Sequence, residues 1–285
     1  MSHSNIFSAI SNEYFHLTGS EKKVADYVQA HRTDVQFMSI SELAEECGVA
    51  DATVSRFCRR MNLRGYSDFK LSLAKAEVVQ NPTELTELPH TEQPDSIAEL
   101  SAQVFQANVL AMRQSMERLN PKLFSTAVDM LVHAERVWCM GQGGSMILAE
   151  EAAHQFSTVC NKFFSVADSH TQVSRVALFD SRDVLFFFSY SGSTKDMMGI
   201  LTLARSRGAK TILLTRFPKS PGAALADVIL QCGSDEGPLQ MGSMPARVAQ
   251  LYLVDLLFQE FCRRDAERTG RNREIILDAL TEKHL

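Results

Sequence analysis

The sequence predicts an α+β protein of two domains, an all-helical domain followed by an α/β domain with a five-stranded parallel sheet flanked by helices. Residues 1–80 show helical periodicity throughout, and residues 97–285 alternate short apolar strands with helical stretches. Between them, residues 81–96 contain three prolines, four acidic residues and no Lys or Arg, which is typical of a polar linker. The length of 285 residues also fits two domains, since one domain usually has roughly 100–150 residues.

Composition and charge exclude several classes of protein. With 45% hydrophobic and 22% charged residues, the chain is neither disordered nor fibrous. Its apolar runs are far shorter than the ~20 residues of a membrane span, and the N-terminus lacks a signal-peptide pattern. The net charge of −5 argues against a chain that binds polyanions along its whole length, but it allows a local basic surface. We therefore expect a cytoplasmic protein without membrane contact.

Six cysteines are scattered along the chain, and no two of them form a CxxC motif. Most lie in apolar segments, so we expect reduced thiols in the core of an intracellular protein. The sequence thus predicts no disulfide, no metal site and no cofactor.

Helix starts in the first domain are marked by two capping boxes, in which a Ser or Thr and a Glu three residues later satisfy each other's backbone N–H groups. The second box opens a short helix that is expected to end at Gly48, since glycine readily adopts the left-handed conformation. Asp51 is expected to cap a third helix over 52–61. Two helices joined by a short turn with glycine form a helix-turn-helix. The two boxes are Thr18 with Glu21 and Ser39 with Glu42.

The third helix presents two different faces. Its outward face starts with small polar residues and continues with arginines, which suits the major groove of double-stranded DNA. Residues 51–75 carry six Lys or Arg against two Asp, although arginines on a solvated helix face are also common. The expected buried residues are Val54, Phe57, Cys58 and Met61. The expected DNA-binding residues are Ala52, Thr53, Ser55, Arg56, Arg59, Arg60, Arg64, Tyr66 and Lys70.

Two turns rich in Gly and Ser follow expected strands of the second domain. GQGGS follows the strand 136–140, and SYSGST follows the apolar strand 183–188, which is expected at the sheet centre. Parallel sheets bind ligands at the carboxyl ends of their strands, where hydroxyls and helix N-termini suit a small phosphorylated ligand such as a sugar phosphate. The other expected elements are helices at 96–118, 145–160, 194–207 and 243–264 and strands at 163–166, 210–215 and 228–232.

The segments LTGSEKKVADYV and MSISELAEECGVADATVSRFCRRMNLRGYSDFKLSL, within residues 17–77, resemble the helix-turn-helix domain of the RpiR/MurR family of bacterial transcription regulators. TVSRFCRR followed by RGYSDFK is the most specific part. Residues 97–285 resemble the sugar isomerase (SIS) domain that this family carries. The resemblance implies a homodimer or homotetramer that binds a palindromic DNA operator, senses a phosphorylated sugar, and controls genes of sugar or amino-sugar metabolism.

The pattern S-x-S-G-x-T after the central strand resembles the phosphate-binding signature of SIS domains. On that resemblance, the expected residues that bind the effector phosphate are Ser145, Ser189, Ser191, Thr194, Gly143 and Gly192. Weaker candidates for the effector pocket are Gly144, Tyr190, Ser193 and Arg247, the last because SMPARVAQL resembles the regulators' version of this segment. His154 and His170 are expected more often on the surface or in the core than at a ligand.

Two alternatives remain open. A sugar-phosphate isomerase with a helical appendage needs a base, and SIS isomerases carry a glutamate where this chain has Pro238, although Asp235 and Glu236 are near. We therefore expect no catalytic residue. A dinucleotide-binding redox regulator would use GQGGSM at the phosphates and Asp168 at the ribose, but Met146 stands where a third glycine is required.

Overall fold

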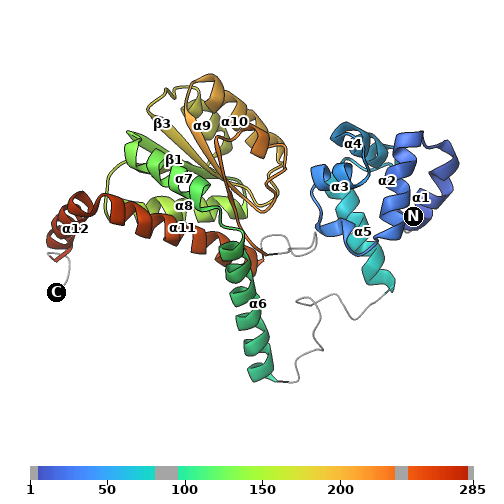
Figure 1. Cartoon of the computed structure of the whole chain (residues 1–285), viewed down its shortest axis with the longest axis horizontal. Helices are drawn as coiled ribbons and strands as arrows, with labels where there is room; N and C mark the ends of the chain where they lie inside the picture. Colours follow the sequence, from blue (N-terminus) through green and yellow to red (C-terminus); the bar gives the residue numbers. More distant parts are fainter. Residues whose placement is uncertain (1–5, 81–95, 235–242, 282–285) are drawn as a thin grey trace. The chain divides into compact units, whose positions relative to one another are not determined.

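The computed structural model describes residues 6–80, 96–234 and 243–281, and the chain forms two compact units that divide within helix α6 (Ile97–Glu117), after Ala107. The linker expected at 81–96 lies almost entirely outside the described residues, so the domain bounds stay predictions. Five helices pack around the core of the first unit (Figure 1). They are α1 (Ile6–Glu13), α2 (Gly19–Ala30), α3 (Ile40–Glu46), α4 (Asp51–Arg60) and α5 (Tyr66–Gln80).

Both expected capping boxes are present, at the starts of α2 and α3. In the second, the Glu42 N–H donates to Ser39 Oγ over 3.1 Å, and the Ser39 N–H donates to the Glu42 carboxylate over 2.8 Å. Gly48 follows α3 with φ +60°, the left-handed conformation that ends the helix. The helix-turn-helix made by α3 and α4 is confirmed.

Asp51 does not cap α4, contrary to expectation. The helix begins at Asp51 itself, and Ala50 occupies the N-cap position without a side-chain cap. The Asp51 carboxylate instead accepts a hydrogen bond of 2.7 Å from Ser41 Oγ and so ties α3 to α4. A carboxylate in the first turn also favours the helix dipole, so Asp51 stabilises the helix start from a different position.

A five-stranded parallel sheet forms the second unit, with strand order β2-β1-β3-β4-β5. All five expected strands are present, and the apolar strand β3 is central, as predicted. Cys232 and Val166, expected at strand ends, lie just beyond them. The strands are β1 (Arg136–Gly141), β2 (Phe163–Ser165), β3 (Asp183–Phe188), β4 (Lys210–Thr215) and β5 (Val228–Gln231).

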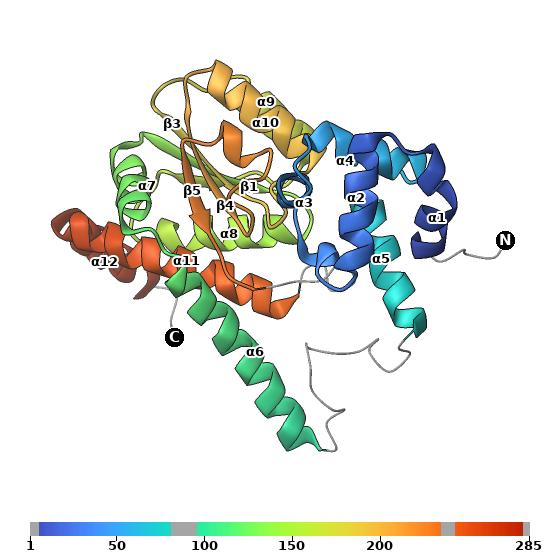
Figure 2. The same ribbon diagram turned by 45° about the vertical axis from the view of Figure 1, so that its right-hand side comes forward.

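Helices cover both faces of this sheet (Figures 1 and 2). Alternation along β3 sends Phe186 and Phe188 into a core with α7, α8 and α11, and Leu185 and Phe187 into a core with α9 and α10. The expected helix at 145–160 is shorter at its end, since α8 stops at Ser157. The covering helices are α7 (Pro121–His133), α8 (Gly144–Ser157), α9 (Ser169–Val176), α10 (Lys195–Ser206) and α11 (Met244–Arg264), and α12 (Ala266–Thr281) follows α11.

A buried carboxylate joins the amino ends of β1 and β3. The Asp183 side chain is 1% exposed and accepts hydrogen bonds from Arg136 Nε at 2.6 Å, from Trp138 Nε1 at 3.0 Å and from the Asp180 N–H at 2.8 Å. Burial raises the pKa of this carboxyl, but the bonds from Arg136, Asp180 and Trp138 outweigh burial and hold the pKa below its ordinary value. The ionised form therefore stabilises the fold.

Asp183→Asn is expected to destabilise the protein by roughly 3 kcal/mol at pH 7, because it removes the buried charge partner of Arg136 and leaves only the partly exposed Asp180 carboxylate, 3.3 Å from the guanidinium. Since the folded-state pKa lies below the unfolded value of about 3.9, the contribution of Asp183 is complete above that value and is lost as the pH falls below it. Urea unfolding at pH 7 and pH 3 measures this. The gap between wild type and variant should narrow at pH 3, and a gap independent of pH would contradict the assignment.

Candidate functional site

The two Gly/Ser turns leave the sheet side by side. Gly141 at the end of β1 is the register partner of Phe188 at the end of β3, and the two strands are hydrogen-bonded neighbours. The turns that follow, 142–145 and 189–194, therefore start at the same edge of the sheet. This is the edge at which open parallel sheets bind their ligands.

The first turn depends on glycines for close packing and a left-handed backbone. A Cβ on Gly141 would lie 2.7 Å from the Ser145 carbonyl oxygen, and Gly143 has φ +56°. Gly143 is also the N-cap residue of α8, and as a glycine it has no side chain that could cap this helix. Ser145, in the first turn of α8, is half-buried. The amino end of α8 thus offers its partial positive charge at the sheet edge.

Hydrogen bonds between residues of the second turn hold its conformation. Ser189 is 5% exposed, and its Oγ accepts a hydrogen bond of 3.2 Å from the Gly192 N–H. Ser191 Oγ accepts a bond of 3.4 Å from the Ser193 N–H. Thr194 is the N-cap residue of α10, yet within the described residues its hydroxyl makes no capping bond. The exposed Thr194 hydroxyl is thus available to a ligand in a way that an ordinary N-cap is not.

Residues outside both motifs complete this edge. A Cβ on Gly192, where φ is +59°, would lie 2.1 Å from Ser220 Oγ, and the Gly222 N–H donates to the Gly192 carbonyl over 2.9 Å. Thr215 Oγ1 donates to the Tyr190 carbonyl over 3.0 Å. The end of β4 and the loop that follows it therefore pack against the second turn and support it. No motif in the sequence indicates this contact.

Three buried polar atoms at this edge lack hydrogen-bond partners among the described residues. They are Gln142 Nε2 in the first turn, Ser220 Oγ beneath the second turn, and Arg247 Nε of α11. The Arg247 guanidinium also packs against the start of α8, since its Nη2 lies 3.2 Å from the position of a Cβ on Gly144. Unpaired buried donors are costly, so their gathering here favours a polar ligand.

The remaining candidates lie outside both turns. His154 lines a groove of about 620 Å³ between α8 and α11, together with Arg247, and His170 is exposed on α9. Asp168 caps α9 by accepting a bond of 2.8 Å from the Thr171 N–H, so the dinucleotide-binding alternative loses the free carboxylate that it placed at the ribose. Positions 235, 236 and 238, on which the isomerase alternative depends, lie outside the described residues.

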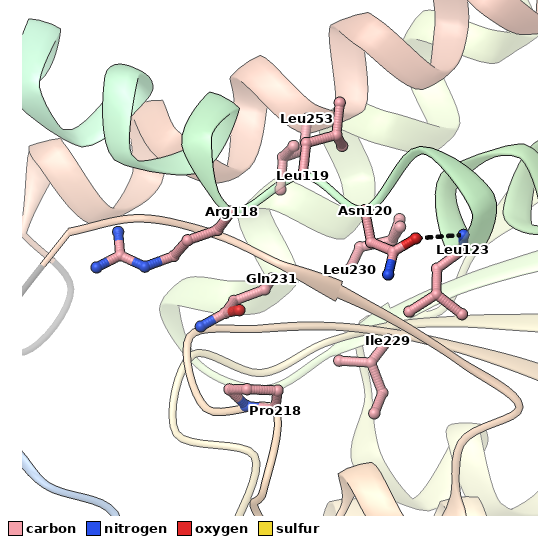
Figure 3. Close-up of a pocket in the computed structure, with 9 residues that line it drawn as sticks. All are labelled: Arg118, Leu119, Asn120, Leu123, Pro218, Ile229, Leu230, Gln231 and Leu253. Carbon is pink, nitrogen blue, oxygen red and sulfur yellow. Dashed lines mark hydrogen bonds between the residues drawn. The ribbon is translucent and has the colours of Figure 1, made fainter.

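A separate cavity of about 220 Å³ lies against β5, and the described residues that line it belong to neither turn. Leu119, Leu123 and Leu253 give it apolar walls, and Pro218 closes it from the loop after β4 (Figure 3). Asn120 also borders it, but its Oδ1 accepts the Leu123 N–H at the start of α7.

Helix α4 has the predicted phase, and its expected stripe of Val54, Phe57, Cys58 and Met61 is buried. Ala52, Arg56 and Arg59 are exposed, as predicted, while Ser55 is half-buried. Thr53 was expected on the outward face, but it is only 6% exposed, and its hydroxyl accepts a bond of 3.0 Å from Arg56 Nη2. Thr53 lies in the first turn of α4, and its side chain packs against the core instead.

Several other expected DNA contacts have partners inside the domain. Arg60 donates to the His16 carbonyl over 2.9 Å and pairs with the buried Glu21 at 3.4 Å. Tyr66 Oη and Lys70 Nζ both donate to the Met38 carbonyl, at 3.1 Å and 3.0 Å, and Arg64 pairs with Asp68 at 2.9 Å. Arg56 and Arg59 are therefore the arginines of α4 whose exposure best suits a duplex.

Comparison with known proteins identifies both parts of the chain. A family model described as the helix-turn-helix domain of the rpiR family matches residues 4–79, and a SIS domain model matches residues 130–259. An uncharacterized HTH-type transcriptional regulator of Clostridium perfringens is 30% identical over 255 residues, which cover 90% of this chain and 91% of that protein. The chain belongs to the RpiR family of transcriptional regulators.

Two further relatives extend over nearly the whole of this RpiR-family regulator. The HTH-type transcriptional regulator HexR of Escherichia coli is 28% identical over 278 residues, covering 98% of this chain and 95% of that protein. The structure of Vibrio vulnificus NanR complexed with ManNAc-6P superposes with a TM-score of 0.87 at 26% identity, covering 98% of this chain and 99% of that one.

The described ranges contain no group of three or more His, Cys, Asp or Glu side chains placed to hold a metal ion. Within the same ranges, no helix combines the length and the apolar character that a membrane crossing requires.

Proposed function

We propose that this RpiR-family regulator binds a phosphorylated sugar at the edge formed by turns 142–145 and 189–194, and that binding changes its affinity for a double-stranded DNA operator. The observation that carries the proposal is the Thr194 hydroxyl, exposed at the amino end of α10 and unused as a cap. The whole-chain similarity to NanR, whose structure contains ManNAc-6P, supports a phosphosugar as the ligand class.

The phosphate is held by hydroxyl and backbone donors. Oxygens of a phosphomonoester carry roughly 1.5 to 2 negative charges at pH 7, and donors at helix amino ends suit them. Gly143 and Gly192 have no Cβ and so let the phosphate approach the backbone closely, while Ser189 Oγ accepts the Gly192 N–H and so also fixes the turn. The proposed hydroxyl donors are Ser145, Ser189, Ser191 and Thr194.

Arg247 closes the pocket on the side of α8. Its guanidinium lies against Gly144, and its Nε is buried without a partner among the described residues, so an anionic or carbonyl oxygen of the effector satisfies it. Tyr190 and Ser193 lie within turn 189–194 and belong to the outer part of the pocket.

Operator binding belongs to α4. We infer that the exposed Arg56 and Arg59 reach the major groove, with Ala52 and Ser55 at the base edges. A homodimer or homotetramer places two such helices on a palindromic operator, in the cytoplasm where the target genes of sugar or amino-sugar metabolism are transcribed.

A thermal-shift screen tests the ligand class with ManNAc-6P, N-acetylglucosamine 6-phosphate, glucose 6-phosphate, fructose 6-phosphate and their unphosphorylated forms. A phosphosugar at 100 times its Kd should stabilise the folded protein by about 2.7 kcal/mol, and the unphosphorylated sugar should not. Ser191→Ala should lose most of this shift.

The same sugars are incubated with the protein in a coupled isomerase assay. Binding without turnover supports a sensor, whereas turnover supports the isomerase alternative. Stabilisation by none of the phosphosugars would refute the proposed ligand class.

A further inference from the structure

Helix α6 is held to the end of the sheet by two backbone N–H groups. After β5, the Gly233 N–H donates to Ser115 Oγ over 2.7 Å, and the Ser234 N–H donates to Gln114 Oε1 over 2.8 Å. The backbones are in close contact here, because a Cβ on Gly233 would lie 2.4 Å from the Ala111 carbonyl oxygen. Ser115 is fully buried, so water does not compete for the bond that its hydroxyl accepts from Gly233.

Ser234 has a backbone conformation that serine rarely adopts. Its φ is +76°, in the left-handed region where a Cβ is unfavourable, and the residue is only 6% exposed. Such a conformation persists only where surrounding bonds hold it, and residues of this kind concentrate at functional and switching sites.

The carbonyl of Ser234 receives bonds from the other side, where the effector turn lies. Tyr190 Oη donates to it over 2.9 Å, and Arg216 Nε donates to it over 3.0 Å. Tyr190 is the second residue of the SYSGST turn, and the Arg216 N–H donates to the Tyr190 carbonyl over 3.1 Å. One residue thus joins the proposed phosphate turn to α6, the helix that leads in the chain from the DNA-binding domain.

We propose that Ser234 positions α6 relative to the effector turn and so transmits phosphosugar binding toward the DNA-binding domain. The inference rests on the proposed function of that turn. When an anion fixes the turn, the Tyr190 hydroxyl moves with it, and the Ser234 peptide changes its bond to Gln114. The effector then favours one of two α6 positions through unequal affinity for the two.

Gln114→Met tests this link, because it keeps the size of the side chain and removes the oxygen that accepts the Ser234 N–H. Gln114→Glu keeps an acceptor oxygen and should retain the response. Gln106→Met makes the same change at an exposed position of α6 and controls for the substitution itself. Tyr190→Phe removes the other end of the link and leaves the ring against Phe217.

Two quantities are measured for each full-length variant. Calorimetry gives the Kd of the phosphosugar that raises the melting temperature of wild type most. Gel shifts on a duplex selected from a random library give the operator Kd with and without that sugar at saturation. Wild type should change its operator Kd by roughly 5- to 150-fold on binding the effector. Gln114→Met should keep its effector Kd within two-fold, while its operator response falls below two-fold; Tyr190→Phe should lose the operator response as well.

A full operator response in both Gln114→Met and Tyr190→Phe would overturn the inference while leaving the proposed function intact. A loss of response that Gln114→Glu fails to restore would also overturn it, since the acceptor oxygen would then be irrelevant. If wild type binds no phosphosugar, the proposed function itself is refuted. This result is obtained before any variant is compared, so it is distinguishable from a failure of the Ser234 link.

Discussion

Gly192→Ala is expected to weaken phosphosugar binding by at least 100-fold and to leave operator binding unchanged. The new Cβ would lie 2.1 Å from Ser220 Oγ, 2.6 Å from its Cβ and 3.0 Å from Thr215 Oγ1, in a backbone with φ +59° that alanine disfavours. The turn must move, and its hydroxyls then miss the phosphate. Losing two hydrogen bonds to a charged group, at roughly 1.5–3 kcal/mol each, corresponds to a weakening of at least about 100-fold.

Gly199→Ala is the matched control, since it makes the same change in α10 a few residues away. Nothing lies within 4 Å of a Cβ at Gly199, and alanine favours the helix by roughly 1 kcal/mol. This variant should bind phosphosugar like wild type and melt at a slightly higher temperature. Calorimetry that finds wild-type affinity in Gly192→Ala would place the effector site away from turn 189–194.

Local signals in the sequence predicted much of this protein. A capping box needs only two residues three apart, so Ser39 and Glu42 mark the start of α3 whatever surrounds them. β3 is buried on both faces, which gives a continuous apolar run with clear ends at Asp183 and Phe188. The left-handed turn at Gly48 follows from glycine alone.

Contacts between distant segments could not be predicted in the same way. Ser220 meets Gly192 only because the β4 crossover returns the chain to the same sheet edge, and Arg247 meets Gly144 through packing of α11 on α8. Helix α12 gave no clear periodic signal, because apolar residues such as Ile275 are exposed along it. Tertiary packing decides all of these positions.

The same limit applies to the arginines of α4, which look alike in the sequence. Helical phase placed Arg56, Arg59 and Arg60 together outside the core, and all three are exposed. The contacts of Arg60 with His16 and Glu21 depend on where α2 lies, and helical phase contains no information about that. The three side chains therefore have different roles that only the folded domain separates.

Arg56→Ala and Arg59→Ala are each expected to weaken operator binding by roughly 10- to 100-fold without loss of stability, because the arginines point to solvent and support little of the domain. Gel shifts at several salt concentrations distinguish their contacts. Removing an arginine that contacts a phosphate reduces the magnitude of the slope of log K against log salt by about 0.9. Removing an arginine that contacts a base relaxes the sequence preference instead.

Arg60→Ala provides the contrast on the same helix. It leaves the Glu21 carboxylate, which is 3% exposed, without its ion pair, so the variant should melt at a lower temperature. Once folded, it should retain most of its operator affinity. The opposite result would be a loss of operator binding in Arg60→Ala at unchanged stability, with Arg56→Ala and Arg59→Ala binding like wild type. The face of α4 assigned to DNA would then be wrong. Exposure would not distinguish the residues that contact the duplex from those that hold the domain together.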